Sequence, residues 1–171
     1  LSGRYVNFEI MPFSFSEYAG ITNKTPDKAG FIEYMESGAL PELFLLPNDE
    51  TKRHYISATK DTVLLRDIIQ RHNIKDAKLL EDIFIYLVNN ASNLVSVLNI
   101  VNFLKSKGRK TTYDTVANYI GFIENTFLVH RVERYDIRGK ETISGNSKYY
   151  VNDLSFKNYL YPGFGYGLGY K

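Results

Sequence analysis

The chain has 171 residues, 44% of them hydrophobic and 23% charged, a composition typical of one average globular domain or two small ones. It has no cysteine, which excludes disulfide frameworks and thiolate metal sites and makes a reducing cytosol the natural setting. The formal net charge of +2 is too small to indicate nucleic-acid binding by itself, so only a local basic patch can support that function. Because no run of about 18 apolar residues occurs, we expect a cytoplasmic protein without a membrane partner.

The first part of the chain is predicted to be one strand followed by helices. Apolar and polar residues alternate over residues 5–10, which indicates a strand. Ser14 followed by Glu17 has the spacing of a capping box and predicts a short helix that turns at Gly20. A second helix is expected over about residues 25–36, and a long helix over about residues 52–72.

Residues 76–153 are predicted to form three helices and then two strands. The third helix is expected to begin after Thr112 as N-cap. The β-rich runs 128–135 and 148–151 are separated by turn sequences at residues 138–140 and 144–146. The inner faces expected for the three helices are Leu79, Leu80, Ile83, Leu87 and Val88; Val97, Ile100, Val101 and Leu104; and Val116, Tyr119, Ile120, Ile123 and Phe127.

Three short helices followed by a two-stranded wing make up the winged-helix version of the helix-turn-helix. The expected fold class is therefore mainly α with a small β wing (α+β), a helical region followed by a winged-helix domain. After residue 153 the chain becomes rich in Gly and Tyr, with few signals of regular structure. In this tail the glycines alternate with large apolar residues, which does not match a dinucleotide-binding fingerprint.

Six short segments in a fixed order resemble a known family. They are residues 1–5, 11–18, 38–42, 65–69, 115–127 and 148–153. In this order and at these separations they are similar to prokaryotic AAA+ superfamily ATPases that have a C-terminal DUF4143 region. The resemblance spans nearly the whole chain.

The resemblance implies four parts. Residues 1–11 would be the last strand of a truncated ATPase core, 12–75 its helical lid region, 76–153 the winged helix, and 154–171 a tail leading to a missing C-terminal domain. It also implies that a parent protein binds and hydrolyses ATP with Mg²⁺, whereas this chain alone needs no cofactor. The partner in cis would then be the missing ATPase core.

The resemblance also places three residues near a nucleotide. Arg4 would follow the sensor strand and act as an arginine finger or sensor. Arg66 and Asp67 would lie on a lid helix, where the arginine senses the nucleotide and the aspartate holds it in place. Each has an alternative structural role in a salt bridge. No catalytic residue is expected in this chain, because the Gly139-Lys140 pair lacks the rest of a phosphate-binding loop.

Metal binding is not expected either. The three histidines, His54, His72 and His130, are far apart, and none has an HxH or HExxH partner.

Basic residues are expected beside the third helix of the winged unit, which reads DNA in proteins of this fold. The outward positions of this helix carry acids and amides instead of cations. The cations gather before the helix and along the wing, where they can neutralise phosphates without reading sequence. The candidate nucleic-acid contacts are Lys105, Lys107, Arg109, Lys110, Arg131, Arg134 and Arg138.

Three functions follow as hypotheses. The first is a non-catalytic lid and winged-helix part of an ATPase, which couples nucleotide state to partner contacts. The second is a winged-helix DNA-binding regulator with sequence-independent backbone contacts. The third is a protein-interaction or self-association module that uses the Tyr and Gly tail as an apolar patch.

Overall fold

The computed structural model describes residues 8–161, except for the side chains of Leu65 and residues 141–144. The first elements are α1 (Phe15–Thr22), α2 (Lys28–Ser37), the 3₁₀ turn η1 (Pro41–Phe44), α3 (Asp49–Lys60), the π-helical segment η2 (Asp61–Ile68) and α4 (Ile69–His72). They are followed by α5 (Ala77–Asn89), β1 (Leu94–Ser96), α6 (Val97–Ser106), α7 (Tyr113–Glu124), β2 (Val129–Asp136), β3 (Glu141–Val151) and α8 (Ser155–Leu160). The predicted α+β fold class, mainly helical with a small sheet, is confirmed.

Local backbone contacts define where α1 begins and ends. Ser14 and Glu17 form the predicted capping box at the start of α1. The helix does not turn at Gly20 as predicted, but continues to Thr22 and ends at Asn23, which has a left-handed backbone with φ of 54°. Of the strand predicted over residues 5–10, residues 8–10 lie outside any strand, and the rest falls outside the described residues.

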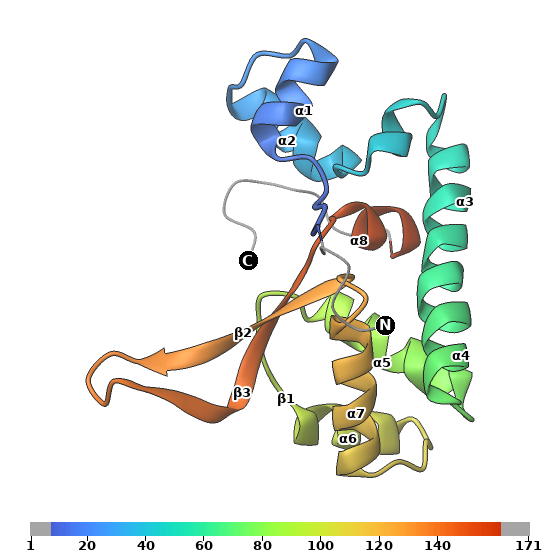
Figure 1. Cartoon of the computed structure of the whole chain (residues 1–171), viewed down its shortest axis with the longest axis vertical. Coiled ribbons are helices and arrows are strands. Elements are labelled where there is room, and N and C mark those ends of the chain that lie inside the picture. The colour runs from blue at the N-terminus through green and yellow to red at the C-terminus, as the bar shows by residue number, and fades with distance from the viewer. Residues whose placement is uncertain (1–7, 162–171) are drawn as a thin grey trace, which may run out of the picture.

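The long helix predicted over residues 52–72 is present as three consecutive segments, α3, η2 and α4. It begins earlier than predicted, at Asp49, because the Asn48 side chain accepts a hydrogen bond from the Thr51 amide. Lys60, at the junction with η2, is only 8% exposed and donates a 2.8 Å hydrogen bond to Glu81 of α5. This ion pair holds the long helix against the winged unit (Figure 1).

The winged unit contains α5, β1, α6, α7, β2 and β3. The inner faces predicted for α5, α6 and α7 supply half of the buried hydrophobic core, in which Leu80, Ile100 and Ile123 are almost fully buried. Phe127 is an exception to the prediction. It lies beyond the end of α7 with a positive φ of 60° and is 56% exposed.

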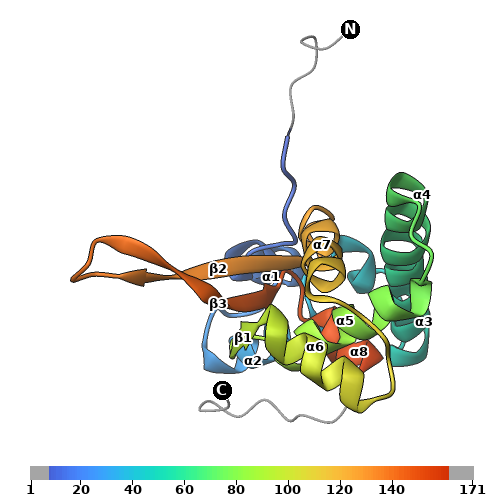
Figure 2. The same cartoon turned by 90° about the horizontal axis from the view of Figure 1, so that it is seen from below.

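The sheet is antiparallel with the order β1-β3-β2, so the wing gains a third strand that the sequence analysis did not predict. The turn predicted at residues 144–146 is absent, since β3 runs through this segment as one strand. Instead, the register with β2 shifts between Glu133 and Arg134, and Gly145 adopts a φ of 109°. Because β1 pairs only with residues 146–148, the outer part of the wing is a two-stranded ribbon that projects from the body (Figures 1 and 2).

The helix α8 returns the chain to the N-terminal helices. Its segment belongs to the predicted tail of residues 154–171, of which residues 162–171 fall outside the described residues. Asp153 is 3% exposed and accepts hydrogen bonds from the backbone amides of Ala39 and Ser155, at 2.7 and 2.8 Å. Asn158 donates to the carbonyl oxygens of Met35 and Glu36. These contacts join the end of the wing to the end of α2.

Candidate nucleic-acid interface

The turn between α6 and α7 presents three exposed lysines. Lys105 lies in the last turn of α6, Lys107 follows the helix, and Lys110 precedes the N-cap of α7. The turn is tight because Gly108 adopts a φ of 77° and its amide donates to the Lys105 carbonyl oxygen. The Lys107 ammonium lies 5.8 Å from the centre of the Phe103 ring. The backbone of this turn therefore fixes the positions from which the lysine side chains extend into solvent.

Arg109 has a structural contact that the sequence analysis did not foresee. Its guanidinium lies 2.9 Å from the Asp82 carboxylate of α5, and Lys78 lies 3.4 Å from the same side chain. The Arg109 side chain is one-third exposed. Since part of its charge is already compensated, it anchors the turn to α5 and is less available to phosphates than its lysine neighbours.

The exposed face of α7 lies between the turn and the wing. Thr112 caps the helix as predicted, and its side chain accepts from the Thr115 amide. Asp114 and Asn118 are exposed, and a Cβ added at Gly121 would meet nothing within 4 Å. Of the two acids predicted on this face, Asp114 is exposed, whereas one oxygen of Glu124 is buried. Tyr113 is 54% exposed, and the described helix itself contains no cation.

The wing carries the second group of cations. Arg131, near its base, donates to the Ser147 hydroxyl at 2.9 Å and lies 3.2 Å from Glu133, so its charge is partly used within the sheet. Arg134 and Arg138 lie further out and are exposed. The turn at the tip is held by a 2.9 Å hydrogen bond from the Arg138 amide to the Asp136 carboxylate.

Two apolar residues of the wing were not selected by the sequence analysis. Tyr135 is 58% exposed and Ile137 is 81% exposed, and both lie between the tip cations. A β-rich run of sequence shows that a strand is present, but it does not show that the strand extends past the body of the protein. The sequence offered one signal that Ile137 is exposed, because the charged residues Asp136 and Arg138 flank it directly.

A buried carboxyl group lies where α7 meets the wing. One Glu124 oxygen has no hydrogen-bond partner among the described residues, and burial raises the pKa of this carboxyl, against a smaller lowering by Arg131. Tyr149 of β3 is 4% exposed, and its burial, followed by the nearby Glu124, raises its pKa to about 12. Tyr149 is therefore neutral at physiological pH.

The three residues predicted near a nucleotide are not brought together by the described structure. Arg66 is exposed on η2. Asp67, on the same segment, lines a cavity of about 350 Å³ together with Arg71 and His72. Arg4 lies outside the described residues. The His72 ring stacks on Phe122 with 3.7 Å between the ring centres, which gives this histidine a packing role.

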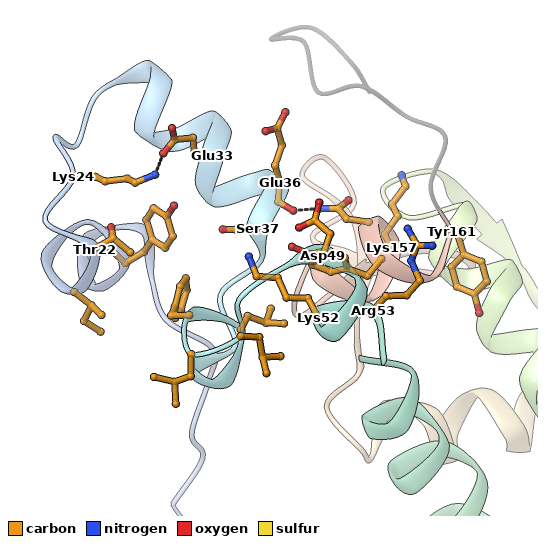
Figure 3. A pocket seen from close by; sticks show the side chains of 18 residues that line it. Thr22, Lys24, Glu33, Glu36, Ser37, Asp49, Lys52, Arg53, Lys157 and Tyr161 are labelled. Atoms are coloured by element: carbon orange, nitrogen blue, oxygen red, sulfur yellow. Dashed lines mark hydrogen bonds and ion pairs between the residues drawn. The ribbon is translucent and has the colours of Figure 1, made fainter. Parts of the chain in front are cut away.

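A groove of about 990 Å³ lies between the α1 and α2 helices on one side and α3 and α8 on the other. Figure 3 shows Lys24 and Glu33 on the first side, Arg53 and Tyr161 on the other, and Asp49 and Lys52 between them. Its wall contains cations and carboxylates in similar numbers, so the groove favours neither anionic nor cationic ligands. None of the predicted site residues within 8–161 lines this groove.

Two further classes of site find no support in residues 8–161. This part of the chain has no group of three or more His, Cys, Asp or Glu side chains placed to hold a metal ion. None of its helices is both long and apolar enough to cross a membrane.

Two relatives are similar to nearly the whole chain. An uncharacterized protein of Haemophilus influenzae is 32% identical over 164 residues, which cover 93% of this chain and 40% of that protein. The uncharacterized protein MJ1544 of Methanocaldococcus jannaschii is 30% identical over 167 residues, which cover 90% of this chain and 37% of the relative. The chain therefore spans about two fifths of the length of the curated relatives it matches. No solved structure is significantly similar to it.

The predicted resemblance to AAA+ ATPases with a DUF4143 region is wrong. The family model that matches is DUF8612, and neither relative is described as an ATPase. The six segments behind that resemblance were short and individually unspecific. The roles given to Arg4, Arg66 and Asp67 rested on it, as did the expected ATP, Mg²⁺ and missing ATPase core, and they lose that basis. Since the model matches residues 28–166, the chain belongs to the family described as Domain of unknown function (DUF8612).

Proposed function

We propose that the winged-helix unit binds double-stranded DNA through its phosphate backbone, without reading base sequence. The observation that supports this function is the placement of exposed cations at both ends of a cation-free α7. Lys105, Lys107 and Lys110 precede the helix in the chain, and Arg134 and Arg138 follow it on the wing. Cations so placed neutralise phosphates, which supplies most of the affinity of non-specific binding.

The length of α7 fits this mode of binding. Its 12 residues span about 18 Å along the helix axis. This is more than the roughly 12 Å width of a major groove. When α7 lies across the groove, the turn and the wing can therefore contact phosphates on opposite sides of it. The helix face between them serves as a spacer, because Asp114 repels phosphates and offers no donor to them.

Salt dependence tests the proposal most directly. Five phosphate contacts predict that log K falls with log[salt] with a slope of about −4 to −5, or on the order of 10²- to 10³-fold between 50 and 200 mM salt. We expect two duplexes of unrelated sequence to bind with dissociation constants that agree within about twofold, as non-specific backbone contacts require. Fluorescence anisotropy with 20-base-pair duplexes at several salt concentrations measures both quantities.

Two double charge reversals make a matched comparison. Lys105→Glu with Lys110→Glu should reduce the salt slope by about 2 and weaken binding to both duplexes alike. The control, Lys28→Glu with Arg53→Glu, changes net charge equally at exposed positions on α2 and α3, away from α7 (Figure 1). Absence of duplex binding at 25 mM salt would refute the proposal, as would a control that loses as much affinity as the test variant.

A further inference from the structure

The outer part of the wing exposes apolar side chains where a soluble loop ordinarily presents polar ones. Beyond the three-stranded region the ribbon projects into solvent, as Figures 1 and 2 show from two directions. At its tip Ile137 is 81% exposed, and Tyr135, the second-last residue of β2, is 58% exposed. Neither belongs to the hydrophobic core or packs against it. Their apolar surface is therefore available to a partner.

The groups around these side chains limit the chemistry of that partner. Arg134, Arg138 and Lys140 contribute three positive charges within residues 134–140, against one negative charge from Asp136. The tip backbone is fixed, since Asp136 accepts from the Arg138 amide and Lys140 adopts a left-handed φ of 53°. Glu133 and Glu141 border this segment, and Arg134 and Arg138 lie next to Tyr135 and Ile137 in the sequence. An aromatic ring and an aliphatic side chain with arginines beside them match a ligand that has flat apolar faces joined by anionic groups. Unpaired or terminal nucleotides have this combination.

We propose that the wing tip binds the unpaired bases at a DNA fork, with Tyr135 stacking on a base and Ile137 packing beside it. Arg134 and Arg138 hold the adjoining phosphates. This inference rests on the proposed duplex binding and adds a preference for one DNA structure. Stacking on aromatic side chains accepts any base, and apolar side chains can act as wedges between bases. The preference therefore concerns the shape of the DNA and is independent of its sequence.

The expected effect is large enough to measure. One stacked base contributes roughly five- to hundredfold in affinity when its aromatic partner is removed. A duplex with two unpaired arms should bind tighter than the same blunt duplex by a factor in this range. The double variant Tyr135→Ala with Ile137→Ser should remove the preference and change the affinity for blunt duplex less than about twofold, because the cations remain.

Two controls separate stacking from other effects. Tyr135→Phe keeps the ring and should keep the preference for forked DNA. Leu45→Ser removes an equally exposed aliphatic side chain, 83% exposed near η1, and should have no effect on either DNA. A 2-aminopurine base at the fork gives a direct signal, because its fluorescence falls when it stacks. That change should occur with the unsubstituted protein and the Phe variant, and be absent with the double variant. Circular dichroism checks that all variants remain folded.

The outcomes distinguish this inference from the proposed function. If neither DNA binds at low salt, both fail. If blunt duplex binds but the fork binds no tighter, or if the preference survives the double variant, only the inference fails. Sedimentation with vesicles of anionic phospholipid is the last measurement. Vesicle binding that the double variant abolishes, without any preference for forked DNA, would assign the tip to membranes and overturn the inference.

Discussion

Removal of the Asp153 carboxylate is the sharpest test of how the wing is joined to the N-terminal helices. Asp153 is 3% exposed and accepts from the Ala39 and Ser155 amides at 2.7 and 2.8 Å. A hydrogen bond to a charged group contributes about 1.5–3 kcal/mol, so Asp153→Ala should destabilise the protein by about 3–6 kcal/mol. This is a large part of the roughly 5–15 kcal/mol that stabilises a typical domain. Asp153→Asn keeps one acceptor oxygen and should lose about half as much.

Urea unfolding followed by circular dichroism measures the change. Thermal unfolding should show a loss of about 6–24 °C for Asp153→Ala. Asp136 supplies a matched control, because it also accepts from the amide two residues ahead, at 2.9 Å, but at the exposed wing tip. Water can replace it there, so Asp136→Ala should lose less than about 1 kcal/mol. If the two alanine variants differ by less than about 1 kcal/mol, the reasoning about burial is wrong.

The remaining predictions concern backbone space and buried charge. Gly38→Ala should destabilise by about 2–4 kcal/mol in thermal unfolding, because φ is 77° and the added Cβ would lie 2.6 Å from Asp153 Oδ1 and from Ser155 Cβ. Gly20→Ala should instead stabilise by about 0.5–1 kcal/mol, since its Cβ meets nothing within 4 Å. Burial raises the pKa of Glu124 above its ordinary 4.5, so its contribution to stability is greatest at low pH and falls as pH rises through the folded pKa. Glu124→Gln should therefore be more stable than the unsubstituted protein at pH 7 and flatten the decline; equal urea midpoints of the two proteins at pH 7 would contradict this.

Helices with a local signature were predicted correctly from sequence. The apolar stripes of α5 and α7 repeat with the helical period, and Thr112 stands where an N-cap is required. Such signals need only neighbouring residues. Phe127 shows their limit, because it continues the stripe of α7 but lies past the end of the helix at Glu124 and itself has a left-handed backbone. Periodicity predicts the face of a helix, not the residue at which it ends.

Elements that depend on distant partners were missed. The three-residue strand β1 exists because it pairs with β3, about fifty positions later in the chain. Helix α8 has no capping side chain at its start, and Asn158 holds it to the carbonyl groups that end α2. The segment around Gly145 has turn chemistry but becomes a bulge, because the long strands on both sides of it pair across the wing. Local composition contains none of this information.

The candidate interface was predicted as a group of cations, and the structure divides that group by function. Arg109 and Arg131 each lie near a carboxylate, so their positive charges are partly compensated within the protein. The lysines of the α6–α7 turn and the outer arginines of the wing remain exposed. On α7 itself, Asp114 in the first turn and Asn118 near the middle face solvent. In the DNA binding that we propose, cations before and after α7 would gain affinity from phosphates and little from base edges. Any selectivity would then come from the shape of the DNA, and the exposed apolar tip of the wing is the part we propose to sense it.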